Sequence, residues 1–271
     1  MDELHRLIGV EHGLDEVSGA LRDEVQRTAA LVVGALEVNC ADESELECVA
    51  AFQRHFVEHL LPDLKTAARA PFRICNLGAR YEEGAVGVAE QHYALPVSAR
   101  SFKVLVVKVN AHVAVSEGPG GMRFGGMRRY ETDSAACGAL HALLRGDELP
   151  ALAELRRTFA ADGHDRIAAL LDPRRVAPAF RYLCAAVVNA RLQAGRAVAD
   201  IRKHKSHTPT LYLVVPCVTL NRSGPDTELV VGYGWVDCRQ AEAPVKYEGL
   251  GDDPARYRVG VQGGRLEVTE E

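Results

Sequence analysis

The stretch Ser101-Phe-Lys-Val-Leu-Val-Val-Lys-Val-Asn-Ala-His-Val-Ala-Val115 decides the fold, because it is the strongest strand signal in the chain. Its β-branched residues favour a strand, and its length and apolar character predict that the strand is largely buried. His112 interrupts this apolar run. A buried imidazole needs a partner, so His112 is either a core histidine bonded to a backbone carbonyl or a metal ligand.

A glycine-rich, basic loop follows this strand and leads to Cys137. The glycines let the backbone approach a ligand, and Arg123, Arg128 and Arg129 add positive charge, so the loop is a candidate anion-binding site. Ser134 lies at the start of the next predicted helix, whose first amides point toward the loop. The same helix N-terminus favours the thiolate of Cys137. The alternative is a solvated surface loop with Cys137 as a small buried residue.

The residues before 71 show a helical period. Apolar residues recur at helical spacing in 14–25 and in 49–60, which predicts an N-terminal helical segment over residues 1–70 with a turn at 39–41. In this interpretation Cys40 is a packing residue.

From residue 71 onward, strands and helices alternate. Short apolar or β-branched runs, typical of strands, occur at 72–77, 85–89, 210–220 and 227–236. Helical periods predict helices over 134–144, 149–159 and 177–204. This interleaving predicts an α/β fold over residues 71–271, with a mixed sheet flanked by helices.

Composition and charge exclude several classes of protein. The formal net charge is -5, and the charges are scattered, which argues against a nucleic-acid-binding face. No run approaches the ~18 apolar residues of a membrane-spanning helix, and the start of the chain lacks a signal-peptide pattern. The seven irregularly spaced cysteines predict free thiols in a reducing cytoplasm. We therefore expect a cytoplasmic protein with a small-molecule substrate and with no nucleic-acid or membrane partner.

Three stretches together resemble the limiting-CO2-inducible B/C family, a branch of the β-type carbonic anhydrases. They are Ala111-His-Val-Ala-Val115, Ser134-Ala-Ala-Cys-Gly-Ala-Leu140 and Val218-Thr-Leu-Asn-Arg-Ser-Gly-Pro-Asp226. The resemblance extends over residues 72–237. It implies a β-carbonic-anhydrase-like fold, a homodimer, and reversible hydration of carbon dioxide to bicarbonate at a zinc ion held by two cysteines and one histidine.

By this motif, His112 and Cys137 are two of the three zinc ligands. The family's first cysteine has no counterpart, because the comparable stretch, residues 85–92, contains no cysteine. Cys75, from a neighbouring strand end, is one candidate for the missing thiolate.

Three alternatives to Cys75 remain open. Glu90 or His92 replaces the thiolate, or the metal site has been lost. Glu90 is also a candidate for the family's acidic residue, with Arg80 or Arg128 as its counter-ion. In the family, this acid–arginine pair governs whether the fourth zinc position accepts water.

Two other functions are consistent with the sequence. Cys137 could be a covalent nucleophile with His112 or His141 as its base, since the segment around Cys137 superficially resembles the nucleophile segment of ketosynthases. The chain could also be a non-enzymatic homo-oligomer that binds a small anion. The metal content of the purified protein would distinguish each of these two functions from a zinc enzyme.

Overall fold

A computed structural model of the protein describes residues 32–41, 71–93, 103–118, 121–125, 137–204, 210–221, 227–238, 246–248, 257–262 and 265–270, together with the single residues 19 and 23. All structural statements concern this part of the chain. Within it, no helix combines the length and the apolar character needed to cross a membrane.

The strands form a mixed sheet. Their bounds are β1 (Val32–Cys40), β2 (Phe72–Asn76), β3 (Lys103–Gly118), β4 (Gly121–Phe124), β5 (Thr210–Asn221), β6 (Thr227–Val230), β7 (Tyr233–Asp237) and β8 (Lys246–Glu248), with a separate hairpin of β9 (Tyr257–Gln262) and β10 (Arg265–Glu270). The order in the sheet is β2-β1-β3-β5-β7-β8, with β4 paired to β3 and β6 paired to β5. Strands β2, β1, β3 and β5 are parallel, and the remaining pairs are antiparallel.

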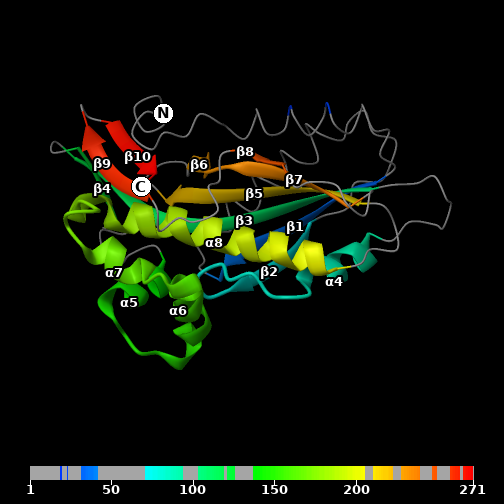
Figure 1. Ribbon diagram of the computed structural model, residues 1–271, viewed down its shortest axis with the longest axis horizontal. Helices are drawn as coiled ribbons and strands as arrows, with labels where there is room; N and C mark the ends of the chain where they lie inside the picture. The colour runs from blue at the N-terminus through cyan, green and yellow to red at the C-terminus, as the bar shows by residue number, and fades with distance from the viewer. Residues whose placement is uncertain are drawn as a thin grey trace.

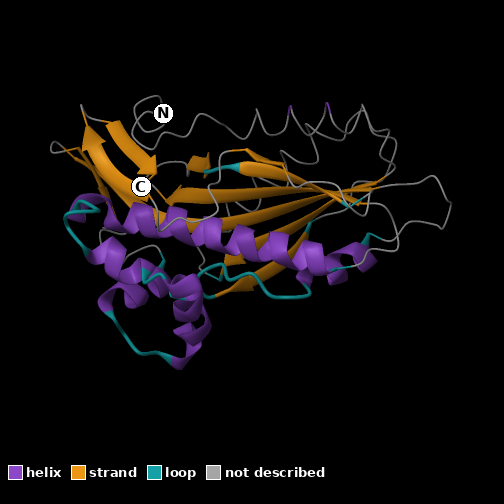
Figure 2. Cartoon of the chain, viewed as in Figure 1, coloured by secondary structure: helices purple, strands orange, loops and turns teal. Residues whose placement is uncertain are grey.

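The helices lie against this sheet and confirm the expected α/β fold. They are α4 (Ala85–His92), α5 (Gly138–Arg145), α6 (Ala153–Phe159), α7 (Arg166–Leu171) and α8 (Arg181–Lys203). Figure 1 shows α8 crossing one face of the sheet. Helix α4 lies near one end of α8, and α5, α6 and α7 are gathered toward its other end. Coloured by secondary structure, the sheet is a single layer with these helices on one side of it (Figure 2).

Two expectations are wrong. Residues 32–40, which we expected to lie in a helical segment, form β1 and pair with both β2 and β3. The segment opens with an apolar run, residues 31–36, that fits a helix or a strand, and this run hides the short apolar–polar alternation of residues 36–40. The other residues of the expected N-terminal helices lie outside the described residues, apart from 19 and 23.

The run at 85–89 forms α4 instead of a strand, and the buried Val86, Ala89 and Glu90 share one side of that helix.

The two faces of the sheet differ in chemistry. On the face against α8, Val38, Val109 and Val214 pack with Ala197. Side chains alternate along each strand, so every second residue lies on the opposite face. On that face the strands begin with apolar residues and end with polar ones. We call these polar side chains the polar patch: they are Glu37, Asn39, Lys108, Asn110, His112, Thr219, Asn221 and Glu228. All of them except Glu228 are buried, and the Glu228 side chain is only 10% exposed.

Glu90 ties α4 to the beginnings of β3 and β5. Its carboxylate accepts hydrogen bonds from the hydroxyls of Thr210, at 2.8 Å, and Tyr212. The same carboxylate lies 2.6 Å from His204 Nε2 and 3.8 Å from Lys103 Nζ. Burial opposes its ionisation, but the bonds from Tyr212 and Thr210, with Lys103 and His204, lower the pKa of Glu90 below its usual value. Glu90 is therefore a charged structural centre.

We predict that Glu90→Ala lowers the free energy of unfolding by about 3–5 kcal/mol, because Lys103 is left buried without its carboxylate. Chemical denaturation monitored by circular dichroism measures the change. Glu83→Ala, which removes only the exposed ion pair with Lys203, is the control and should cost less than about 1 kcal/mol. Equal effects of the two substitutions would contradict the structural role of Glu90.

Candidate metal centre

Cys40, His112 and Cys137 form a buried cluster of three metal-ligating side chains. Their ligand atoms all lie within 4.8 Å of one another. His112 is fully buried, and each cysteine is 5% exposed. The cluster joins the end of β1, the middle of β3 and the residue that immediately precedes α5.

The cluster forms because β1 and β2 end at the same level. Cys40 is the last residue of β1 and pairs with Asn76, the last residue of β2. Asn39 pairs with Asn110, so Cys40 lies at the level of the residue before His112. By alternation, Cys40 belongs to the face against α8 and His112 to the opposite face. Where β1 ends, no backbone separates the two faces, and the two side chains meet.

The orientation of His112 is set by Asn221 at the end of β5. The Nδ1 atom of His112 lies 2.9 Å from Oδ1 of Asn221. Since an amide oxygen only accepts hydrogen bonds, this contact assigns the ring proton to Nδ1. Nε2 is then the ring atom that can bind a metal ion, once it carries no proton, as in protein sites where a histidine ligand donates its other N–H to a partner.

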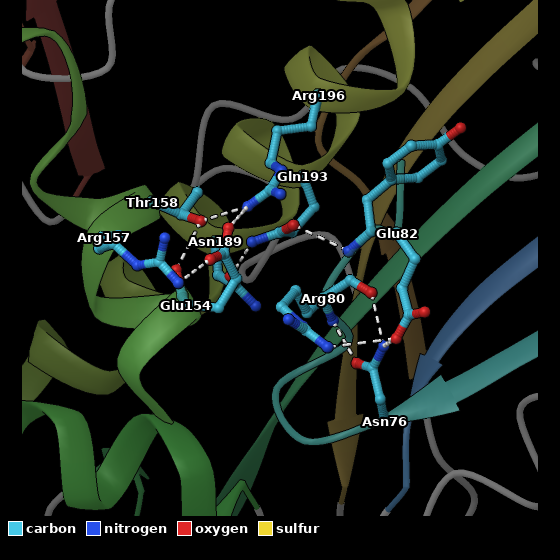
Figure 3. A network of polar contacts seen from close by, with 10 residues as sticks. Asn76, Arg80, Glu82, Glu154, Arg157, Thr158, Asn189, Gln193 and Arg196 are labelled. Carbon is cyan, nitrogen blue, oxygen red and sulfur yellow. Dashed lines mark hydrogen bonds and ion pairs between the residues drawn. The ribbon is translucent and has the colours of Figure 1, made fainter. Parts of the chain in front are cut away.

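A polar network joins the loop after β2 to α8, and α8 in turn to α6 (Figure 3). The Asn189 amide donates to the Gly78 carbonyl at 2.7 Å, and the Tyr81 N–H donates to Gln193 Oε1 at 2.8 Å. Gly78 has φ 74°, a conformation that glycine adopts at low cost. This conformation allows a backbone hydrogen bond from Gly78 to Cys40.

Cys40 is the acidic thiol of the cluster. A hydrogen bond from the Cys137 side chain lowers its pKa most, burial raises it, and His112 and the Gly78 backbone lower it further, to about 4. The cluster therefore favours the thiolate form of Cys40. A thiolate is the form of cysteine that binds metal ions.

The three side chains fit a zinc ion. Zinc binds cysteine sulfur at about 2.3 Å and histidine nitrogen at about 2.0 Å, so donors at tetrahedral positions lie about 3.5–4 Å apart. The observed separations need at most a small contraction to reach these values. Three protein ligands leave a fourth position open, which is typical of catalytic zinc sites.

The structure brings His112 and Cys137 together, as we expected, but the third member of the cluster is Cys40. Cys75 is exposed on β2, paired in register with Asn39, and lies outside the cluster. Glu90 contacts Lys103, the first residue of β3, nine residues before His112. At 3.3 Å per residue this places Glu90 about 30 Å from the cluster.

The other residues singled out from the sequence also lie apart from the cluster. His92 is exposed at the end of α4, and the Arg80 guanidinium pairs with Glu82, at 3.2 Å, instead of with Glu90. His141 contacts the Tyr182 hydroxyl through Nδ1 at 2.8 Å. Arg123 is exposed on β4. Three candidates lie outside the described residues, namely Arg128, Arg129 and Ser134.

Sequence reasoning missed Cys40 and Asn221. Two signals could have found Cys40: β-branched Val32 and Val33 open its segment, and Val38-Asn39-Cys40 resembles Val109-Asn110-Ala111 on the neighbouring strand. Asn221 carried no such signal, because an asparagine before Arg-Ser-Gly-Pro is the ordinary start of a turn.

We predict that the metal-free protein keeps one thiolate down to about pH 4, because the lowered pKa of Cys40 favours the charged form. A pH titration of thiolate absorbance in the ultraviolet measures it. Cys40→Ser should abolish this acidic titration, whereas Cys75→Ser, at an exposed cysteine, should leave it unchanged. An acidic thiolate that survives Cys40→Ser would contradict the assignment.

Comparison with known proteins supports the fold. No protein-family model and no curated protein matches the chain. The crystal structure of PtLCIB4, a homolog of the limiting CO2-inducible protein LCIB, matches with a TM-score of 0.63 and 14% identity over 92% of this chain and 99% of that one. Two mutants of PtLCIB4 match with TM-scores of 0.58 and 0.57, at 16% and 15% identity, over 88% of this chain and 94% and 95% of theirs. The chain therefore has an LCIB-like fold.

Proposed function

We propose that the protein is a zinc-dependent, carbonic-anhydrase-like enzyme that hydrates carbon dioxide reversibly to bicarbonate. The observation that carries the proposal is the buried cluster of Cys40, His112 and Cys137, with its donor atoms within 4.8 Å. The LCIB-like fold supports it. So does the family resemblance of the segments around His112 and Cys137.

Each part of the site has a role in this proposal. Cys40, His112 and Cys137 hold the zinc ion, and Asn221 keeps the His112 ring in the orientation that presents Nε2. When bound, zinc supplies a Lewis acid that makes water acidic enough to react near neutral pH. We also propose that the arginines expected from the sequence, Arg123 among them, bind bicarbonate.

We expect the protein, purified without a metal-affinity tag, to contain one zinc ion per chain and to hydrate carbon dioxide. Cys40→Ala, His112→Ala and Cys137→Ala should each remove the zinc and the activity, because two ligands are too few for a stable site. Elemental analysis and a stopped-flow pH-indicator assay measure the two outcomes.

The matched control for these variants is Cys75→Ala, which should keep both zinc and activity because Cys75 lies outside the cluster. Full retention of zinc in any of the three ligand variants would defeat the assignment. So would loss of zinc in the control.

A second prediction concerns Asn221. Asn221→Leu should weaken zinc binding by about 10- to 100-fold, because removing the partner of a ligating histidine loosens its orientation. Competition with a chromogenic chelator measures the affinity. Asn110→Leu is the control: Asn110 is a buried amide of the polar patch that bonds Thr219 instead of His112, so this substitution should cost stability but leave zinc affinity unchanged. Equal losses of affinity would show that Asn221 has no special role.

A further inference from the structure

The polar patch contains a group of charges inside the sheet. Lys108 is fully buried, forms an ion pair with Glu228, and has its Nζ atom 3.9 Å from Oε1 of Glu37. On the other side of Glu37, the Arg73 Nε atom lies 3.5 Å from Oε2. Two carboxyl groups therefore share one buried lysine.

Glu37 is poorly supported as an anion. Neither of its oxygens has a hydrogen-bond partner among the described residues, and the same holds for both polar atoms of the Asn39 side chain. A buried carboxylate without hydrogen bonds is costly, so a buried carboxyl group tends to bind a proton. Burial, opposed by Lys108 and Arg73 and reinforced by Glu228, raises the pKa of Glu37 to about 7. The nearby Cys217 adds no charge, since burial raises its pKa well above the usual value.

Glu37 has the metal cluster near it along β1 and a partly exposed arginine beside it on β2. It precedes Cys40 by three residues on β1, a distance of about 10 Å along the strand. Asn39 is on the same face as Glu37 and pairs with Asn110, two residues before His112. In the other direction, the Arg73 side chain is 37% exposed and gives Glu37 a route to solvent.

We propose that Glu37 is a buried proton acceptor that serves water chemistry at the Cys40–His112–Cys137 cluster. This inference rests on the proposed function, because hydration of carbon dioxide to bicarbonate releases one proton per turnover. That proton passes through ordered water bonded to Asn39, a residue whose free donors and acceptors suit such a water. The Glu37 carboxylate binds the proton and then loses it to solvent beside Arg73. Only O–H bonds form and break, and Glu37 returns to the carboxylate after each cycle.

The first test is an infrared pH titration of the metal-free full-length protein. The wild type should show a protonated carboxyl band that disappears with a midpoint at about pH 7. Glu37→Gln should remove this band while the protein stays folded, because Lys108 keeps its pair with Glu228. Glu228→Gln should shift the midpoint to lower pH, because it removes a negative charge next to Glu37. A band that persists in Glu37→Gln, or a midpoint that Glu228→Gln leaves unchanged, would overturn the proposal.

The second test uses the zinc-loaded protein at low buffer concentration. Glu37→Gln should lower kcat by about 100-fold, leave kcat/KM unchanged, and regain kcat when a small diffusible buffer such as imidazole is added. Glu83→Gln, at an exposed position far from the patch, should change neither constant. An equal loss in kcat and kcat/KM, or no loss of kcat, would overturn the proton-acceptor role. If the wild-type protein held no zinc or had no hydration activity, the proposed function would be refuted instead. The infrared titration uses metal-free protein, so its result does not depend on that function.

Discussion

The end of β1 at Cys40 is the constraint on which the site depends. In a continuous sheet, backbone separates the side chains of the two faces, so a cysteine from one face and a histidine from the other cannot bind one ion. Because β1 and β2 both end at this level while β3 continues, the separation disappears beside His112. The loop after β2 and the start of α5 close the gap, bringing Gly78 and Cys137 to the same point.

The helices on one side of the sheet hold this point in place. Asn189, Gln193 and Asp200 of α8 bond the loop between β2 and α4, and Asp200 Oδ2 accepts from the Tyr81 hydroxyl at 2.6 Å. The side chains that position the loop are thus buried amides and a carboxylate with fixed partners. Such satisfied buried groups rigidify their surroundings. A rigid loop keeps the Gly78 backbone within reach of Cys40, which favours the thiolate of Cys40.

Sequence reasoning reached those parts of the fold and site whose signals are local. The β-branched run around His112 and the helical period of residues 177–204 each specify one element, and β3 and α8 follow. Strand β1 was missed because its apolar opening hides the short alternation of residues 36–40, and Cys40 was missed with it. Cys75 was the plausible substitute, since it also lies near the end of a strand, but register pairs it with Asn39, which leaves β1 between Cys75 and His112 on β3. Register is a property of two chain segments, so no single segment reveals it.

The polar patch is difficult to explain as a device for stability alone. Lys108 is balanced by Glu228, and a second carboxyl group beside the same lysine brings a desolvation cost that Lys108 and the partly exposed Arg73 do not offset, since the pKa of Glu37 stays raised. Burial raises the pKa of Glu37 to about 7, so relative to an unfolded chain its ionisation destabilises the fold progressively as pH rises from about 4.5 to 7. A glutamine or a leucine at this position would avoid that cost. The position of Glu37 is better explained by what a carboxyl group can do and those residues cannot, which is to exchange a proton near neutral pH beside a cluster whose proposed chemistry releases one.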